Sequence, residues 1–152
     1  MKSSKNLYYS LDKQRVFRYH TDERRYMDIL IDRFKNAHHV AVVGATDNPN
    51  KFGYKVFKKL QHEGKIVYAV NPTKETIDGE KVYSKLSDIT GPIDAISLIV
   101  NPLTGLQVLA DAYTKGIRLV WCQPGAESPE LIAWCAMNDM ACIVDRCVLV
   151  DI

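Results

Sequence analysis

VAVVGATDNPNKFGY, at residues 40–54, is the stretch of sequence that decides the fold. Its three valines and one alanine, without a polar interruption, are typical of a strand covered on both faces in a parallel sheet. Gly44 ends this strand, and a helix follows Lys51. Because glycine has no Cβ, the backbone there can turn sharply and lie against a ligand, while the first N–H groups of the helix point toward the same place. The stretch therefore predicts a nucleotide-binding turn.

The same stretch argues against a full dinucleotide fingerprint. Thr46 stands where the pattern G-x-G-x-x-G has its second glycine, and no third glycine follows at the required distance. We therefore disfavour NAD as the ligand. A plain strand-to-helix turn without any ligand is the alternative that these residues alone leave open.

Composition limits the class of protein. The 152 residues fit one domain, and 47% hydrophobic with 25% charged residues is ordinary for a globular chain. No apolar run approaches the length that spans a bilayer, and the N-terminus has no apolar region typical of a signal peptide, so we expect a cytoplasmic protein. A formal net charge of +2 is too small to indicate nucleic acid or a membrane surface as a partner.

Strand and helix patterns alternate along the chain. Beyond the strand before Gly44, strands are predicted over residues 66–70, 94–100, 117–122 and 141–144. Helices are predicted over residues 22–34, 52–64, 102–116 and 129–138. This alternation predicts an α/β fold, a Rossmann-like three-layer domain with a mainly parallel five-stranded sheet in the order 3-2-1-4-5. Residues 1–21 would form an N-terminal extension and residues 22–152 the domain, with residues 76–89 packing back without a long element.

Polar loops follow the predicted strands, and a parallel sheet brings these loops to one edge, where a ligand is expected at the switch between strands one and four. Asn71 follows the second strand, where an NAD enzyme would place a carboxylate on the ribose, and Lys74 lies close behind it. A ribose that carries a phosphate would be tolerated or preferred here, with Lys74 as its counter-charge. The alternative is that Asn71 belongs to a simple turn and Lys74 to the surface.

Five motifs together resemble the small stand-alone CoA-binding proteins of bacteria and archaea. These proteins are relatives of the CoA-binding domain of succinyl-CoA synthetase α subunits and of acyl-CoA synthetases. The motifs are VAVVGAT (40–46), VNP (70–72), GEKVY (79–83), WCQPG (121–125) and DRC (145–147). The resemblance covers the chain from about residue 22 to its C-terminus.

The resemblance implies a row of ligand-binding positions. Against the ribose and phosphates of coenzyme A it places Gly44, Ala45, Thr46, Asn48 and Lys51. Beside the adenosine and its 3′-phosphate it places Asn71, Pro72 and Lys74, and beside the adenine Val100 and Asn101. Along the pantetheine it places Gln123, Pro124 and Gly125, and in the segment that is P-N-C in the larger enzymes Arg146 and Cys147. Thr73 departs from the T-P-G-K loop of the synthetases, where a glycine stands.

The resemblance also implies binding of coenzyme A or an acyl-CoA without catalysis, by a carrier, a sensor or a regulatory module. The synthetases phosphorylate a histidine in a second domain, whereas no histidine follows His62 in this chain. The alternative is a redox enzyme or regulator that binds NAD(P). Of four cysteines without a C-x-x-C pair, Cys147 would either form a mixed disulfide with the CoA thiol or be a buried strand-end thiol. No metal site is predicted, and a homo-oligomer is left open.

Overall fold

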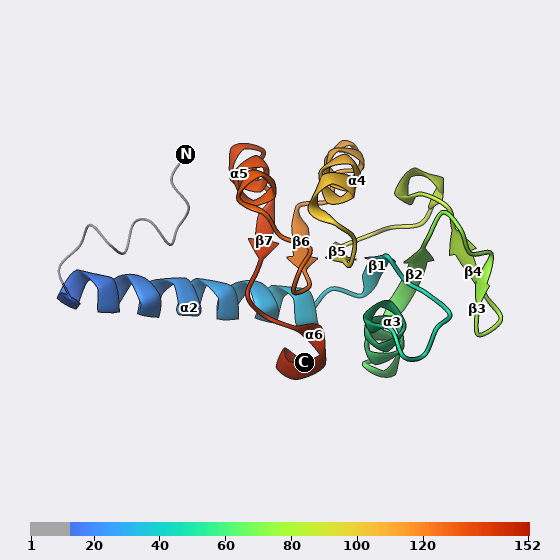
Figure 1. Cartoon of the computed structure of the whole chain (residues 1–152), viewed down its shortest axis with the longest axis horizontal. Coiled ribbons are helices and arrows are strands. Elements are labelled where there is room, and N and C mark those ends of the chain that lie inside the picture. Colours follow the sequence, from blue (N-terminus) through green and yellow to red (C-terminus); the bar gives the residue numbers. More distant parts are fainter. Residues whose placement is uncertain (1–12) are drawn as a thin grey trace.

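A single twisted sheet lies at the centre of the molecule (Figure 1). The computed structural model describes the backbone of residues 13–152 and the side chains from residue 22 onward. The strands of this part are β1 (His39–Val43), β2 (Ile66–Val70), β3 (Thr76–Ile77), β4 (Glu80–Tyr83), β5 (Ala95–Leu98), β6 (Leu119–Cys122) and β7 (Ala141–Ile143). Their order is β3-β4-β2-β1-β5-β6-β7, and only β3 and β4 pair antiparallel.

Helices follow most of the strands. They are α2 (Lys13–Lys35), α3 (Phe52–His62), α4 (Pro102–Thr114), α5 (Pro129–Met137) and α6 (Val148–Asp151), with a 3₁₀ turn at Leu86–Asp88. The helices predicted after the first, third and fourth strands are confirmed as α3, α4 and α5. Asn101 and Ser128 cap α4 and α5 through their side-chain oxygens, and a proline follows each cap at the first helical position.

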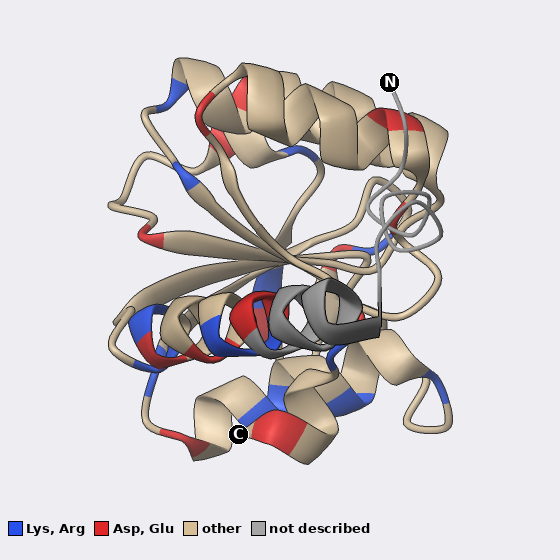
Figure 2. Ribbon diagram, turned by 90° about the vertical axis from the view of Figure 1, so that its left-hand side faces the viewer, with Lys and Arg blue, Asp and Glu red and all other residues tan. Residues whose placement is uncertain are grey.

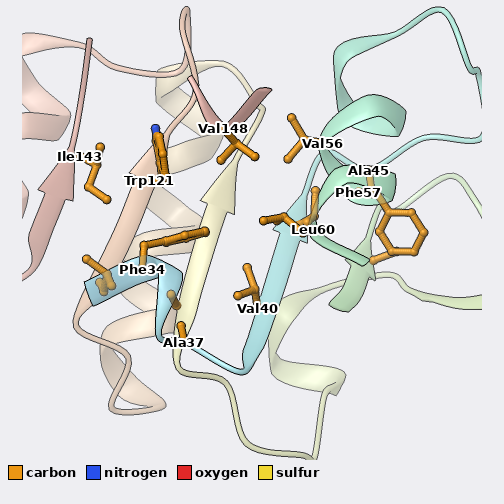
Figure 3. Packing of buried hydrophobic residues seen from close by; sticks show 14 of the residues in the cluster. Phe34, Ala37, Val40, Ala45, Val56, Phe57, Leu60, Trp121, Ile143 and Val148 are labelled. Carbon is orange, nitrogen blue, oxygen red and sulfur yellow. The ribbon is translucent and has the colours of Figure 1, made fainter. Parts of the chain in front are cut away.

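The helices form two layers, one on each side of the sheet (Figure 2). Alternate side chains of the strands point to opposite layers, so that Val40, Val42 and Trp121 pack toward α2, α3 and α6. Figure 3 shows this core, in which Phe34 of α2 meets Trp121 edge-on at 5.0 Å between ring centroids. On the other face, Val43 and Cys122 pack toward α4 and α5. The α/β three-layer fold is therefore confirmed.

The predicted strand count and order were wrong in detail. The sheet contains β3 and β4 in addition to the five predicted strands, which lie in the order 2-1-3-4-5 rather than 3-2-1-4-5. The reason is that β4 occupies the place beside β2, after a hairpin turn at Asp78 and Gly79 and without a crossover helix. The chain then returns to the far side of β1 as β5, which places the switch point between β1 and β5.

The first helix begins earlier than predicted. We expected a start near Asp22, whereas α2 begins at Lys13 and so crosses the predicted boundary between an extension and a domain. No glycine or proline interrupts the helix between these points, so no breaker separates the two parts. Residues 1–12 of the predicted extension lie outside the described residues. Within the described part of the chain, no helix combines the length and apolar character required to cross a bilayer.

Candidate functional site

The turn after β1 is built on Gly44. Its backbone has φ +99°, and its N–H donates to the carbonyl of Val70 at 3.0 Å. A Cβ at this position would lie 2.1 Å from the carbonyl oxygen of Ile99, which follows β5. Only glycine fits both the positive φ and this contact. Gly44 therefore lets the ends of β2, β1 and β5 approach one another at the switch point.

A second glycine, Gly53, packs the first turn of α3 onto this turn. A Cβ on Gly53 would lie 2.1 Å from the carbonyl oxygen of Gly44. Sequence reasoning did not assign Gly53 a role, because its distance from Gly44 does not fit the dinucleotide pattern. The available signal was a glycine in the first turn of a predicted helix. Helical backbone does not require glycine there, so a close contact with neighbouring backbone is the remaining explanation.

The loop between Gly44 and α3 holds itself in shape. The side-chain oxygen of Asn48 accepts from the N–H of Asn50 at 3.0 Å, and the carbonyl of Asn48 accepts from the N–H of Lys51. Lys51 occupies the N-cap position of α3 and supplies no side-chain hydrogen bond to the helix. The N-terminal end of α3 therefore lacks a side-chain cap, which is an arrangement suited to an anion.

The loop after β2 is fastened to the loop after β1. The side-chain N–H of Asn71 donates to the carbonyl of Ala45 at 2.7 Å, and its side-chain oxygen accepts from the N–H and the hydroxyl of Thr73 at 2.9 Å each. Lys74 forms an ion pair with Asp47, with 3.2 Å between Nζ and Oδ1. The predicted positions at the ends of β1 and β2 thus lie together, although the amide of Asn71 is used within the protein.

A cleft of about 630 Å³ opens between the loop after β2 and the face formed by β4 and the residues that follow it. The cleft is lined by Pro72, Thr73, Lys74, Glu75, Lys81, Val82, Tyr83, Ser84 and Asp88. The lining from β4 onward was missed as part of the site because β4 was not predicted, although the GEKVY motif had marked part of it. The Lys81 ammonium lies over the Tyr83 ring, 4.6 Å from its centroid.

The predicted positions after β5 lie next to the Gly44 turn. Asn101 accepts a hydrogen bond from the N–H of Thr104 at 2.9 Å and so serves as the cap of α4. Val100 is half-buried and packs against the core under α4 and α5. The side chain of Asn101 therefore has a structural partner at the position where the sequence predicted a contact with adenine.

The predicted positions after β6 divide into one buried and two exposed residues. The side chain of Gln123 is fully buried, its N–H donates to the Ser97 hydroxyl at 3.1 Å, and its oxygen accepts from the N–H of Val148 at 3.0 Å. Pro124 and Gly125 are exposed in the loop that follows. The Gln123 side chain thus holds α6 against the sheet, and both of its polar atoms are occupied.

The predicted positions after β7 fasten α6 and α2. Arg146 forms ion pairs with Asp28 of α2 at 3.0 Å and with Asp151 of α6 at 3.5 Å. The N–H of Cys147 donates to the Asp151 carboxylate at 2.9 Å, and the Cys147 side chain is half-buried. The structure therefore brings the positions after β1 and β2 together, and Pro72 and Lys74 among them line the cleft. Arg146 is instead directed toward two helices.

The cysteines of the described chain are all free thiols. The sulfur atoms of Cys122 and Cys142 lie 3.8 Å apart, and a hydrogen bond with Cys142, together with burial, raises the pKa of the Cys135 thiol. A thiol whose pKa is raised, such as that of Cys135, is a poor nucleophile, since the thiolate is the reactive form. Among the side chains that the structure describes, residues 22–152, no three of His, Cys, Asp or Glu are grouped in a way that would hold a metal ion.

Comparison with known proteins bears on this site. Residues 38–152 match the sequence model of a family described as a CoA binding domain. The ADP-forming acetate–CoA ligase II subunit alpha of Pyrococcus furiosus is 36% identical over 90 residues, which are 59% of this chain and 20% of that subunit. The chain thus spans about a fifth of that relative's length. An uncharacterized protein of Bacillus subtilis is 29% identical over 111 residues, covering 73% of this chain and 82% of that protein.

A solved structure shares the fold over its whole length. A conserved hypothetical protein from Pyrococcus furiosus superposes with a TM-score of 0.72 at 35% sequence identity. The match covers 76% of this chain and 99% of that protein. A small chain of the same architecture therefore exists by itself.

Proposed function

The chain belongs to the CoA-binding domain family, and on that premise we propose that it binds coenzyme A or an acyl-CoA at the carboxyl edge of its sheet. The observation that carries the proposal is the turn after β1. There Gly44 and Gly53 bring backbone within contact distance of neighbouring backbone, beside a helix N-terminus without a side-chain cap. Such a turn is suited to the diphosphate of a nucleotide.

The proposed placement of the ligand extends from this turn to the cleft. The adenosine and its 3′-phosphate would lie toward Pro72 and Lys74, which line the cleft between the loop after β2 and β4. The pantetheine would run toward the exposed Pro124 and Gly125. In this placement Gln123 and Arg146 support the site through α6 and α2, rather than through their side chains on the ligand.

The proposed role is that of a cytoplasmic carrier, sensor or regulatory module without catalysis of its own. Among the described residues, the side chains of Asn71, Lys74, Asn101 and Gln123 are engaged in hydrogen bonds, an ion pair or a cap within the protein. None of the side chains assigned to the site forms a nucleophile–base pair with another. This arrangement favours binding over acyl or phosphoryl transfer.

A thermal-shift titration tests the ligand. We expect CoA, acetyl-CoA and dephospho-CoA to raise the melting temperature, because a ligand at about a hundred times its Kd adds roughly 2.7 kcal/mol to stability. NAD and NADP serve as comparison ligands under the same conditions. Stabilisation by NAD or NADP alone would overturn the proposal and indicate redox chemistry.

A pair of lysine variants tests the placement of the 3′-phosphate. We expect Lys74→Ala to weaken binding of CoA more than binding of dephospho-CoA, since Lys74 is the proposed counter-charge. Lys35→Ala is the matched control, because Lys35 is exposed and ends α2 ahead of β1, at the opposite edge of the sheet. An equal loss of affinity for both ligands in Lys74→Ala would show that Lys74 does not contact the 3′-phosphate.

A further inference from the structure

Lys74 is already paired with a carboxylate in the structure. Its ammonium lies 3.2 Å from Oδ1 of Asp47, and the two side chains are 38% and 51% exposed. Asp47 comes from the loop after β1 and Lys74 from the loop after β2, so the ion pair joins the two loops. Because both side chains reach solvent, the pair can be exchanged for another partner at small cost.

Asp47 supplies a negative charge where the sequence indicated none. The residue after β2 is Asn71, which removes the carboxylate that an NAD-binding site has at this position. The hydrogen bond from Asn71 to the carbonyl of Ala45, at 2.7 Å, draws the two loops together. This contact brings Asp47 of the loop after β1 to Lys74 of the loop after β2. A carboxylate therefore lies near the end of β2, although it comes from the other loop.

We propose that Asp47 sets the phosphate selectivity of this site by competing with the ligand for Lys74. The inference rests on the proposed binding of CoA at the carboxyl edge. A ligand that carries a phosphate monoester on its ribose must draw the Lys74 ammonium away from Asp47 and must approach a carboxylate of like charge. A ligand without that phosphate leaves the pair intact. Asp47 therefore reduces the advantage that the 3′-phosphate would otherwise give.

The cleft is also lined by the charged side chains of Asp88, Lys81 and Glu75. Asp88 accepts a hydrogen bond from the Ser84 hydroxyl at 2.9 Å, and Lys81 lies over the ring of Tyr83. Glu75 also lines the cleft and adds a negative charge beside Lys74. The lysine that joins the cleft to the turn after β1 is Lys74, so the partner of Lys74 decides how much positive charge a phosphate meets there.

Calorimetric titration of CoA and dephospho-CoA into four proteins tests the inference: the wild type, Asp47→Asn, Lys74→Ala and the double variant. We expect Asp47→Asn to raise the preference for CoA over dephospho-CoA by roughly two- to fivefold, the range of an exposed ion pair. In the Lys74→Ala background the same substitution should raise the preference less, because only the direct repulsion between Asp47 and the phosphate is then removed. Raising the salt concentration should reduce the effect, because exposed charges are screened.

Asp139→Asn is the control for the loss of one negative charge. Asp139 is exposed at the end of α5 and has φ +53°, a conformation that asparagine also tolerates, so the preference should not change. An unchanged preference in Asp47→Asn, with both ligands bound, would overturn the inference and leave the proposed function standing. Binding of neither ligand to the wild type would overturn the proposed function itself.

Discussion

The two ends of the carboxyl edge of the sheet use polar residues in different ways. At the ends of β1 and β2, Asp47 and Lys74 form an exposed ion pair beside an open cleft and a helix without a side-chain cap. At the ends of β6 and β7, Gln123 and Arg146 direct their side chains to Ser97, Val148, Asp28 and Asp151. The first region keeps exchangeable partners, whereas the second fastens two helices to the sheet.

The difference teaches that a polar residue at a strand end is not by itself a ligand-binding residue. Both regions follow strands of the same parallel sheet, and both carry the residue types expected of a nucleotide site. What separates them is how exposed the paired side chains are, since Lys74 and Asp47 are 38% and 51% exposed whereas Gln123 is fully buried and Arg146 is 24% exposed. This exposure depends on contacts distant in sequence. The following predictions test this division from the largest expected effect to the smallest.

Substitution of Gly44 should have the largest effect. In Gly44→Ala the new Cβ meets the carbonyl of Ile99 at 2.1 Å on a backbone with φ +99°, so we expect a loss of about 3 kcal/mol or more in the free energy of unfolding. Gly64→Ala is the control, because Gly64 also has a positive φ and a Cβ added there would meet no atom within 4 Å. It should cost about 1 kcal/mol. Equal costs in urea unfolding would show that the contact at Gly44 is relieved.

Truncation of Gln123 should come next. Gln123→Ala leaves the buried hydroxyl of Ser97 and the N–H of Val148 without their partner, so we expect a loss of about 2 kcal/mol in unfolding free energy. Gln107→Ala, on the exposed face of α4, should change stability little. At temperatures where the variant remains folded, its Kd for CoA should stay within twofold of the wild type. A selective loss of CoA affinity would instead place the Gln123 side chain on the ligand.

Arg146→Ala should have a smaller effect. Its partner Asp28 is 58% exposed, so we expect a loss of only about 1 kcal/mol for the two ion pairs together. The exposed Arg33 of α2 provides a control that removes the same charge. If Arg146 supports the site only through the helices, a double-mutant cycle with Asp28 will show coupling in urea unfolding while CoA affinity changes little. A tenfold loss of CoA affinity without that coupling would contradict the assignment of Arg146 to the region that fastens helices to the sheet.

The amino edge of the sheet provides the reference with the smallest expected effect. Hydrogen bonds from the backbone of His39, at 2.9 Å, and of His38 hold the pKa of the Asp94 carboxyl below its ordinary value. Because the folded pKa is depressed, this stabilisation is present above about pH 3.9 and is lost as the pH falls through the folded pKa. The difference in unfolding free energy between wild type and Asp94→Asn should therefore be larger at pH 6 than at pH 3. A constant difference would contradict it.

Much of the fold was predictable because it depends on local patterns. The apolar runs of β1, β5 and β6 and the Ser128–Pro129 helix start were assigned correctly. The strand β4 was missed because it is short, Val82 is its buried residue, and its pairing with β2 is limited to its last two residues. The pairing of β4 with β2 depends on tertiary contacts, which the local sequence pattern does not reveal. The order of the sheet depends on this pairing.

The arrangement of residues at the candidate site was predictable in part. The ends of β1 and β2 were expected to meet, and Asn71 and Lys74 do lie at that junction. The partner of Lys74 was not expected, because Asp47 lies in a different loop and comes near only when the strands are parallel neighbours. The burial of Gln123 could not be predicted either, because its two partners lie in β5 and α6, which are distant from it in sequence.

The packing of Phe34 on Trp121 gives the molecule an optical reporter on one face of the sheet. Trp121 is fully buried against α2, whereas Trp134 lies half-buried on α5, with its ring edge-on to Tyr113 at 6.3 Å. These are the two tryptophans of the chain, and each reads one helical layer. Fluorescence of Trp134→Phe would follow the release of α2, and fluorescence of Trp121→Phe the loosening of α4 and α5. Transitions that coincide would mean that both layers melt as one cooperative unit.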